Sequence, residues 1–385
     1  MTRPVAPGST IGILGGGQLG RMTAMAARSL GYHVHVLDPE PECAARPVAD
    51  VCFTADFDDA LAAAELAKAC DVVTVEIEKI APASLHAAAL YAPLRPGAHI
   101  IEIVQDRGRQ KRWLADNGFP MGAYRDVHSE HDLSVVAAEM GSPVFAKSCT
   151  GGYDGRGQAL VQTPADAGSA WRAIGGGPAV AERALDLELE MSVMVARTSN
   201  GDIAVFPPAL NHHEERILAW SVIPGPIPPA ATRQAIELAR GIAEAIGLEG
   251  LLAVEIFLLR DGTVLVNELA PRPHNSFHAT ERACVTSQFE QHVRAICSLP
   301  LGSTDIVTPA AIVNLLGDLW RDGPPPFERA LRLPGVRLHL YGKKGARPGR
   351  KMGHLSAIGS TPREAIARAQ EAMAVLHAVP KAAHS

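Results

Sequence analysis

Short apolar runs alternate with helix-like segments over the N-terminal part of the chain. The run TIGIL precedes a glycine-rich turn, a helix-like segment and a second apolar run, HVHVLD. A further run, DVVTVEIEKI, follows in the same region. Strands that alternate with helices are typical of a parallel sheet, so this pattern predicts a Rossmann-like α/β domain.

The rest of the chain shows short strands and turns instead. The runs SPVFAK, GQALVQ and AVAERAL surround a glycine-rich loop, which predicts a small α+β domain. Farther on we expect a hairpin that turns at Asn200-Gly201 and a helix around PAATRQAIELARGIAEAIG. The charged segment IVQDRGRQKRWLADNGFP connects the first two regions. We therefore expect three domains, over residues 1–105, 106–185 and 186–385, the last with a basic hairpin in its tail.

The composition is typical of a globular protein with a sizeable core. The chain has 385 residues, of which 47% are hydrophobic and 20% are charged. None of its six cysteines stands in a CxxC pair, which favours reduced thiols over a disulfide scaffold or a zinc site. The sequence has no signal-peptide core and no apolar run of about 18 residues, so we expect a cytoplasmic protein that does not cross a membrane. The net charge of −5 predicts no nucleic-acid partner, although a few local cations can still bind a small anion.

The first glycine motif matches a dinucleotide fingerprint. Gly15, Gly17 and Gly20 form GxGxxG between a strand and a helix, and Asp38 follows near the end of the next strand. Such a turn brings backbone amides and a helix N-terminus to a pyrophosphate, which would support a nicotinamide-dependent oxidoreductase. The motif alone is weak, because any strand–helix–strand unit needs small residues at this crossing. A Rossmann-like domain with another ligand, or with none, stays open.

A predicted hairpin near residue 260 places two carboxylates opposite each other. If Asp261-Gly262 forms a two-residue turn and Arg260 pairs with Thr263, then Glu255 stands directly across from Glu268. Their Cβ atoms would be about 5 Å apart, and at an effective dielectric of about 20 the repulsion is on the order of 3 kcal/mol. Either one carboxyl keeps a proton with a raised pKa, or a hard cation such as Mg²⁺ lies between them. A different register, with both glutamates solvated, is the alternative.

The second glycine-rich loop, GGYDGRGQ, follows a strand that ends at Lys147. A lysine beside glycine-rich backbone suits a nucleoside triphosphate, because the ammonium group and the amides can meet the phosphate oxygens. The order differs from a P-loop, in which the lysine follows the glycines. The alternative is an ordinary lysine at a strand end.

Six motifs together resemble one enzyme family. GGGQLGRM, KSCTGGYDGRGQ, AVEIF, NELAPRPHNS, TSQFEQHVRA and ARPGRKMGH occur in this order, and the match runs from about Ile11 to His354. They resemble the N5-carboxyaminoimidazole ribonucleotide synthases, which are ATP-grasp enzymes of de novo purine (IMP) biosynthesis. The resemblance implies an ATP-grasp fold, combining α/β and α+β parts with an N-terminal Rossmann-like domain, and a homodimer. The first glycine turn would then serve a ribonucleotide rather than NAD.

The resemblance also implies the reaction and its cofactor. ATP, bicarbonate and 5-aminoimidazole ribonucleotide would give the N5-carboxyamino product, ADP and phosphate, with ATP between the central and C-terminal domains. Bicarbonate would attack the γ-phosphoryl group to form carboxyphosphate. The exocyclic amine would then take up its carboxyl group or the CO₂ that it releases, and the glycine loop would exclude water.

The family motifs imply residues for the nucleotide and the metal. Glu182 to Leu185 would hold adenine, mainly through the backbone, Glu190 the ribose hydroxyls, and the glycine loop the phosphates. Strict alternation in the strand would point Asn267 away from the glutamates. Glu255 and Glu268 are the implied Mg²⁺ ligands. The ATP set is Arg107, Lys147, Gly152, Tyr153, Asp154, Gly155, Arg156, Gly157, Gln158, Glu182, Arg183, Ala184, Leu185, Glu190, His213, Asn267 and Glu268.

A second set is implied for the ribonucleotide and for catalysis. Lys343 and Arg350 would meet its phosphate, although a basic run of this kind is more often a solvated hairpin. Gln18 and Leu19 would add contacts from the first glycine turn, unless that turn is a plain helix start. The ribonucleotide set is Gln18, Leu19, Glu76, Tyr153, Asp154, Arg156, Arg272, His274, Asn275, Lys343 and Arg350. The catalytic set is Lys147, Asp154, Arg272 and His274, and either Asp154 or His274 would manage the amine proton.

Four positions depart from the usual family pattern. Phe277 stands where glycine is usual and Ala279 where an aromatic residue is usual, which puts the shape of the ribonucleotide pocket in doubt. Arg216 replaces a glycine, and Gly108 replaces a leucine. Three other functions stay open: another ATP-grasp ligase such as a formate-dependent glycinamide ribonucleotide transformylase, an NAD-dependent oxidoreductase, and a binding protein without catalysis.

Overall fold

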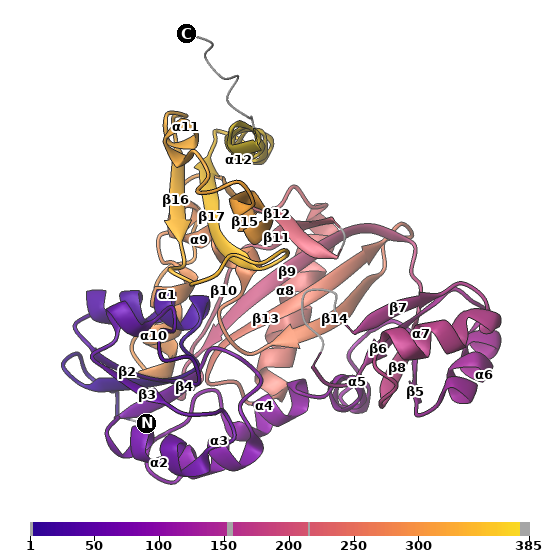
Figure 1. The fold of residues 1–385 in the computed structure, drawn as a ribbon, viewed down its shortest axis with the longest axis horizontal. Helices are drawn as coiled ribbons and strands as arrows, with labels where there is room; N and C mark the ends of the chain where they lie inside the picture. Colours follow the sequence, from indigo (N-terminus) through magenta and orange to yellow (C-terminus); the bar gives the residue numbers. More distant parts are fainter. Residues whose placement is uncertain (1–2, 152–156, 215, 378–385) are drawn as a thin grey trace.

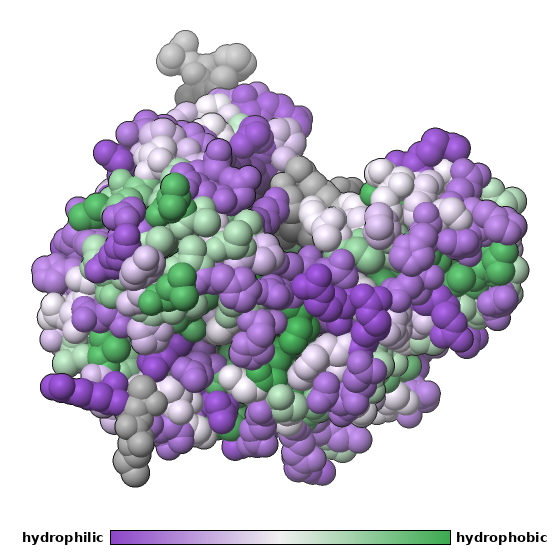
Figure 2. Space-filling model, turned by 90° about the horizontal axis from the view of Figure 1, so that it is seen from below, coloured by the Kyte–Doolittle hydropathy of each residue, from purple (hydrophilic) through white to green (hydrophobic). Residues whose placement is uncertain are grey.

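The strands within the described residues form three separate sheets, each with its own helices (Figure 1). The structure is a computed structural model, and it describes residues 3–151, 157–214 and 216–377. The central sheet lies in a lobe at one end of the molecule, and a notch separates this lobe from the larger body (Figure 2). None of the helices described is both long enough and apolar enough to span a lipid bilayer.

The N-terminal sheet is parallel, as the alternation of strands and helices predicted. Its order is β3-β2-β1-β4, and helices cover it. β1 enters the first glycine turn, where a Cβ on Gly20 would lie 2.5 Å from the carbonyl oxygen of Gly15. Only glycine therefore lets the following helix start this close to the strand. The elements are β1 (Thr10–Leu14), α1 (Gln18–Ser29), β2 (His33–Asp38), β3 (Val51–Thr54), α2 (Ala60–Lys68), β4 (Val72–Val75), α3 (Pro82–Ala89) and α4 (Ala98–Val104).

The central sheet is antiparallel in the order β5-β8-β6-β7. Helix α5 (Arg107–Asp116) leads into it, and Asp106 caps that helix by accepting the amide of Arg109. The loop between β6 and β7 carries the second glycine motif. The elements are β5 (Tyr124–Val127), α6 (Glu130–Met140), β6 (Val144–Ser148), β7 (Gln158–Val161), α7 (Ala167–Ala173) and β8 (Ala179–Arg183).

The large sheet carries most of the C-terminal half in the order β14-β13-β9-β11-β12-β15-β17-β16, with β10 beside β9. The hairpin expected at Asn200-Gly201 joins β9 and β10, and the expected helix is α8. The strands are β9 (Leu187–Arg197), β10 (Ile203–Val205), β11 (Ala209–Glu214), β12 (Ile217–Ile223), β13 (Gly250–Leu259), β14 (Val264–Ala270), β15 (Ala310–Leu316), β16 (Val336–Leu340) and β17 (Lys351–Ile358). The helices are α8 (Pro229–Ala245), α9 (Thr280–Ala283), α10 (Gln288–Ile296), α11 (Phe327–Leu331) and α12 (Pro362–His377).

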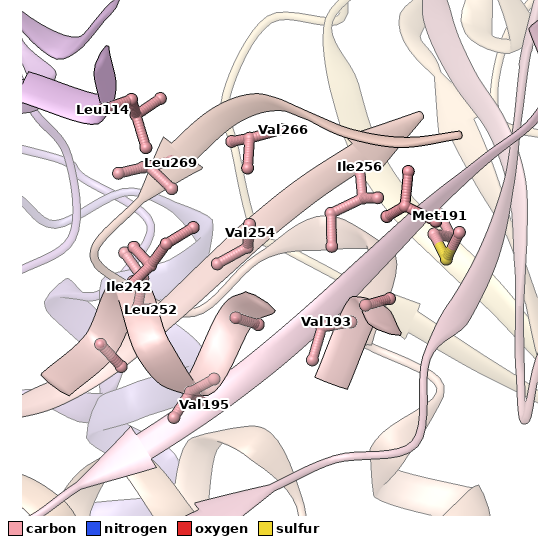
Figure 3. Packing of buried hydrophobic residues seen from close by; sticks show 14 of the residues in the cluster. Leu114, Met191, Val193, Val195, Ile242, Leu252, Val254, Ile256, Val266 and Leu269 are labelled. Atoms are coloured by element: carbon pink, nitrogen blue, oxygen red, sulfur yellow. The ribbon is translucent and has the colours of Figure 1, made fainter. Parts of the chain in front are cut away.

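One apolar cluster joins one face of the large sheet to the helices that cover it (Figure 3). Val254 of β13, Val193 of β9 and Ile242 of α8 belong to this cluster, and Leu269 of β14 lies beside Leu114 of α5. All five side chains are at most 4% exposed. Since α5 precedes the central sheet, this burial holds the polar face of α5 against the end of β14.

The β13–β14 hairpin contains a bulge that the sequence did not predict. Leu258 pairs with Val264, and the amide of Leu259 donates to the carbonyl of Thr263. The loop between Leu259 and Thr263 therefore spans three residues and not two, with Gly262 at a φ of 87°. The register then shifts beyond Ile256, where β14 carries one extra residue, and Glu255 faces Glu268. The predicted two-residue turn was therefore wrong, yet the predicted opposition of the two glutamates is confirmed, because the bulge offsets the longer loop.

Candidate active site

The glycine turn after β1 binds two carboxylates of the chain itself. Glu76, directly after β4, accepts hydrogen bonds from the amides of Gly17 and Gly20 at 2.7 and 2.8 Å. Asp38, at the end of β2, accepts one from Gly16 at 2.7 Å. A dinucleotide pyrophosphate would need these amides, and another anion beside two carboxylates is disfavoured. The oxidoreductase interpretation of the GxGxxG motif therefore loses its physical basis.

The basic tail hairpin folds back onto this turn. Lys343 donates to the Oε1 atom of Gln18 at 2.7 Å, although 325 positions separate the two residues. Arg350, on the same loop, donates to the backbone carbonyls of Lys344 and Gly345. The loop is thus held against the N-terminal sheet, which differs from a plain solvated hairpin. The side chain of Leu19 is only 8% exposed and packs in an apolar cluster, so any ligand contact from this residue would use its backbone.

Glu255 and Glu268 face each other at the end of the β13–β14 hairpin, and Arg107 of α5 reaches them. Arg107 Nη2 lies 3.0 Å from Glu268 Oε2. Burial, followed by repulsion from Glu268, raises the pKa of Glu255 to about 7. Burial alone would raise the pKa of Glu268, but the charges of Arg107 and Lys147 lower it. One carboxyl is therefore poised to hold a proton in the absence of a cation, which is one of the two outcomes expected from the sequence.

The expectation that Asn267 points away from the glutamates was wrong. Asn267 is the extra residue of the bulge, so strict alternation fails there, and its Nδ2 atom donates to Glu255 Oε2 at 3.3 Å. The bulge thus adds a polar side chain to the carboxylate pair.

Three cations converge on Glu182 of β8. Its Oε2 atom lies 2.8 Å from Lys147 Nζ and 3.5 Å from Lys111 Nζ, and its Oε1 atom lies 3.9 Å from Arg107 Nη1. Burial alone would raise the pKa of Glu182, but Lys147, Lys111 and Arg107 lower it to about 2. The carboxylate therefore stays charged and holds three cations close to the second glycine loop, where they are placed to meet phosphate oxygens.

Lys111 was missed by the sequence reasoning, although its signal was present. Its side chain is only 1% exposed, and its Nζ atom donates to the carbonyl of Asn267 at 3.2 Å. The neighbouring Gln110 exchanges hydrogen bonds with the backbone of Leu269. Lys111 lies one helical turn after Arg107, so the two point from the same face of α5. If QDRGRQK is interpreted as a helix, its spacing predicts that Arg107 and Lys111 lie on one face.

A shallow groove of about 350 Å³ lies over β9, β11 and β12. Its polar lining includes Glu190 and His213, whose Oε2 and Nδ1 atoms are 2.8 Å apart, together with Asn211. Trp220 stacks on His212 at a centroid distance of 5.0 Å and forms part of the wall. The groove is therefore lined by two residues predicted to bind the nucleotide, Glu190 of β9 and His213 of the neighbouring strand β11.

Residues just beyond β14 connect the carboxylate pair to the N-terminal sheet. His274 Nε2 lies 3.2 Å from Glu255 Oε1, and Arg272 Nε lies 2.8 Å from Glu78 Oε1. Burial, and then the charge of Arg272, lowers the pKa of His274 well below its ordinary value, so this imidazole is neutral. Both polar side-chain atoms of Asn275 are buried without a hydrogen-bond partner among the described residues, as a ligand-binding amide would be.

Glu78 is the second residue that the sequence reasoning missed. It lies in the turn that follows β4, two positions after Glu76, and its place just beyond the end of a parallel strand was the available signal.

Part of the predicted ATP set lies outside the described residues, namely Gly152, Tyr153, Asp154, Gly155 and Arg156. At the ends of that loop, the carbonyl of Gly157 accepts the amide of Ser148, and Gln158 pairs with Lys147 across β6 and β7.

In the segment from Glu182 to Leu185, two amides are already engaged inside the central lobe. Arg183 donates to the carbonyl of Ala123 and Ala184 to that of Pro143. A nucleobase at this segment would have to use the remaining backbone groups, such as those of Leu185.

The departures from the family pattern lie in three different surroundings. Phe277 and Ala279 are fully buried in the core beneath the large sheet, where the ring centroids of Phe277 and Phe206 are 6.1 Å apart. Gly108 lies in α5, and a Cβ there would come within 3.0 Å of Asp126. Arg216 adopts a φ of 70° and donates to the carbonyl of Gln158 at 3.0 Å.

Three family models match consecutive parts of the chain. A ribonucleotide synthetase preATP-grasp domain matches residues 8–105, an ATP-grasp domain matches residues 112–289, and a phosphoribosylaminoimidazole carboxylase C-terminal domain matches residues 310–368.

Whole-chain relatives agree with these matches. N5-carboxyaminoimidazole ribonucleotide synthases of Bacillus subtilis and Brucella melitensis are 41% and 42% identical, over 91% of this chain and 92% and 97% of their own lengths. A solved ADP complex of an N5-carboxyaminoimidazole ribonucleotide synthetase has a TM-score of 0.92 at 41% identity, covering 97% of this chain and 98% of that one. The Aspergillus clavatus enzyme with ADP and 5-aminoimidazole ribonucleotide has a TM-score of 0.88 at 33% identity, covering 96% and 99%.

Proposed function

The chain belongs to the N5-carboxyaminoimidazole ribonucleotide synthase family, and on that premise we propose how its own residues perform the reaction. The protein catalyses the ATP-dependent carboxylation of 5-aminoimidazole ribonucleotide to N5-carboxyaminoimidazole ribonucleotide in purine biosynthesis. It is therefore an ATP-grasp ligase that forms a carbon–nitrogen bond.

ATP binds between the central sheet and the large sheet in our proposal. Three cations that lie around the Glu182 carboxylate bind the phosphates of ATP, namely Lys147, Lys111 and Arg107. They lie in a buried site of low dielectric constant, where their attraction to phosphate oxygens is strong. The glycine loop covers the phosphates, and the backbone from Glu182 to Leu185 holds the base. The groove with Glu190 and His213 takes the ribose, because a carboxylate and an imidazole can both bind its hydroxyls.

Glu255 and Glu268 fit a magnesium ion. They supply facing carboxylate oxygens, and the repulsion that raises the pKa of Glu255 disappears when a divalent cation lies between them. The Asn267 amide beside Glu255 can orient that carboxylate. When bound, Mg²⁺ would offset charge on the phosphate oxygens of ATP.

The ribonucleotide lies between the N-terminal sheet and the end of β14 in our proposal. Lys343 and Arg350 bind its phosphate, Gln18 and Glu76 lie beside that loop, and Asn275 offers an amide with no hydrogen-bond partner among the described residues. Tyr153, Asp154 and Arg156 would complete the pocket from the glycine loop, and Leu19 would contribute through its backbone.

The proposed reaction has two steps. An oxygen of bicarbonate attacks the γ-phosphorus, the bond to the β,γ-bridging oxygen breaks, and ADP leaves as carboxyphosphate forms. The exocyclic amine then attacks the carboxyl carbon, phosphate leaves with the C–O bonding electrons, and the amine loses one proton. Lys147 and Arg272 offset negative charge in both steps. His274, being neutral, or Asp154 accepts the proton.

One observation carries this arrangement. His274, from the ribonucleotide set, lies 3.2 Å from Glu255 of the metal pair, so the two halves of the site meet at one point. The test is ADP release measured with and without 5-aminoimidazole ribonucleotide, in bicarbonate buffer and in CO₂-depleted buffer. We expect full turnover only with both compounds present. Equal ADP release without the ribonucleotide would contradict the proposed pocket.

Three further expectations rest on the resemblance and on the arrangement of the sheets. We propose that each sheet with its helices is one domain, which keeps the boundaries at residues 1–105, 106–185 and 186–385. We also propose that the protein is a homodimer and works in the cytoplasm.

A further inference from the structure

A second cluster of metal-type ligands lies outside the proposed active site. Glu281 of α9 approaches two histidines of the tail hairpin, His339 of β16 and His354 of β17, and the end of β16 points toward α9 (Figure 1). One potential donor atom from each of the three residues lies within 4.8 Å of the others. None of these residues belongs to the nucleotide, ribonucleotide or magnesium sets proposed above.

The fold itself brings the two histidines together. His339 and His354 are directly opposite partners in the antiparallel β16–β17 ladder, and residues in such positions project from the same face of the sheet. Their rings stack with centroids 5.1 Å apart and an interplanar angle of 13°. On the same face, Glu281 Oε2 lies 3.9 Å from His339 Nδ1.

A hydrogen bond to Nδ1 of His354 determines which nitrogen of this ring can bind a ligand. The hydroxyl of Tyr341 lies 2.9 Å from His354 Nδ1, so Nε2 is the remaining donor position of that ring. Metal-binding histidines commonly have their other nitrogen oriented in this way. Behind His354 the ring of His278 stacks at 4.9 Å, and Gln288 donates to its Nδ1 atom, so His278 supports the cluster without joining it.

The neutral histidines and the nearby arginines favour a transition-metal ion over a hard cation at this cluster. Burial, and then His339, lowers the pKa of His354 to about 3, and burial, and then Arg21, lowers that of His339, so both imidazoles are neutral and able to ligate. Arg337 and Arg282 are close enough to Glu281 to lower its pKa, although burial raises it to about 7 overall. Nearby arginines disfavour a hard cation held by charge alone, whereas an ion with directed bonds to imidazole nitrogen tolerates them better.

We propose that Glu281, His339 and His354 bind a divalent transition-metal ion of the zinc class. Two imidazole nitrogens and one carboxylate oxygen are a common zinc ligand set, with a water in the fourth position. Tetrahedral ligands at about 2.0–2.1 Å from the ion would lie roughly 3.4 Å apart, so donors now within 4.8 Å of one another must approach by up to about 1.4 Å. The ring of His339 must also turn out of its stack on His354, because an imidazole nitrogen binds a metal in the plane of its ring. The side chains of His339 and Glu281 are 19% and 33% exposed and have room for this movement, while His354 is fixed in the core.

Cobalt(II) is the probe for this site, because tetrahedral Co²⁺ absorbs visible light far more strongly than octahedral Co²⁺. Tag-free protein is titrated with Co²⁺ in excess Mg²⁺, which occupies the Glu255–Glu268 pair. We expect one equivalent of Co²⁺ with tetrahedral bands, displaced by Zn²⁺. Glu281→Gln should weaken binding at least 10-fold, and His339→Asn should abolish the bands.

Two control variants separate this site from others. His86→Asn removes an exposed histidine that pairs with Glu102 elsewhere, and Glu268→Gln removes a proposed magnesium ligand; both should keep the bands. Circular dichroism and the metal-free Tm must match the wild type in Glu281→Gln and His339→Asn. The proposal is wrong if the wild type shows only octahedral Co²⁺, if His339→Asn titrates like the wild type, or if Glu268→Gln alone removes the bands.

Discussion

At the scale of single residues, the site is organised by carboxylates that hold cations in place. Glu182 keeps Lys147, Lys111 and Arg107 together, and Arg107 also reaches Glu268. Buried charges of this kind persist only when they are paired, because desolvation disfavours each ion alone. Phosphate oxygens can replace the carboxylate as partners, so the pairing both stabilises the protein without ATP and orients the cations for it.

The substitution Glu268→Gln tests the metal pair. It keeps the shape of the side chain but removes one negative charge from the proposed Mg²⁺ site, so we expect kcat/KM to fall by about 100-fold or more, a loss of about 2.7 kcal/mol or more of transition-state stabilisation. The measurement is ADP release as a function of Mg²⁺ concentration. Glu237→Gln, on the exposed face of α8, is the matched control and should behave as the wild type. A fully active Glu268→Gln enzyme would contradict the metal role.

Arg350→Ala tests the phosphate end of the ribonucleotide pocket. We expect the KM for 5-aminoimidazole ribonucleotide to rise about 10-fold, equivalent to about 1.4 kcal/mol, because one charge-assisted contact is lost. The KM for ATP should stay unchanged, since Arg350 belongs to the other half of the site. Initial rates at varied concentrations of each substrate give both constants. Arg347→Ala, an exposed arginine of the same loop, should leave both unaltered; an equal effect of the two variants would argue against a specific phosphate contact.

At the scale of elements, irregular backbone decides which side chains meet. The bulge in β14 turns Asn267 toward Glu255, and the hairpin between β11 and β12 places Arg216 against the end of the second glycine loop. Arg216 adopts a φ of 70°, which an L-residue other than glycine, asparagine or aspartate seldom adopts. Its hydrogen bond to Gln158 ties the central sheet to the large sheet.

Two substitutions separate the backbone strain at Arg216 from its contact. Both Arg216→Gly and Arg216→Ala remove the hydrogen bond to Gln158, but only glycine relieves the positive φ. We therefore expect the glycine variant to be more stable than the alanine variant by about 1 kcal/mol in urea unfolding. Equal unfolding free energies of the two variants would show that the backbone relaxes when the arginine is removed.

At the scale of the whole molecule, α10 fastens the N-terminal sheet to the large sheet. Arg95, between α3 and α4, donates to the carbonyl of Ile296 and to Ser298, and its Nε atom lies 2.8 Å from Glu249. The buried His292 of α10 lies 3.0 Å from the hydroxyl of Thr74 in β4. The proposed ribonucleotide site uses residues from both sheets, so this junction would hold the two sides of that site in a fixed relative position.

Acid should weaken this junction. Burial lowers the pKa of His292 from 6.5 to about 3, so the folded protein holds the ring neutral while the unfolded chain takes up a proton below pH 6.5. Its contribution to stability is therefore complete above pH 6.5 and is lost as the pH falls toward 3, amounting to about 2 kcal/mol at pH 5 at most.

Thermal unfolding at pH 7.5 and at pH 5 measures this effect. His292→Gln can keep a bond to Thr74 but cannot ionise, so the fall in Tm on acidification should be smaller than in the wild type. His128→Gln, at an exposed position, should leave the fall unchanged. An identical acid shift in His292→Gln and the wild type would contradict the assignment.

Local patterns in the sequence determined the elements and the main chemistry. The alternation of runs predicted the parallel N-terminal sheet, because strand periodicity is a short-range property. The spacing of Glu255 and Glu268 predicted their opposition through a two-residue turn that was wrong, and the bulge at Asn267 offsets the longer loop. The family motifs also named residues that the fold brings into contact across a long stretch of chain, such as Gln18 and Lys343.

Only the tertiary structure decided how distant groups use one another. In the tertiary structure Glu76 accepts the amides of the first glycine turn, Lys111 joins the cations around Glu182, and a bulge turns Asn267 toward Glu255. Each of these depends on packing between elements far apart in the chain, which fixes the register and the depth of burial. Periodicity along a single segment contains no information about either.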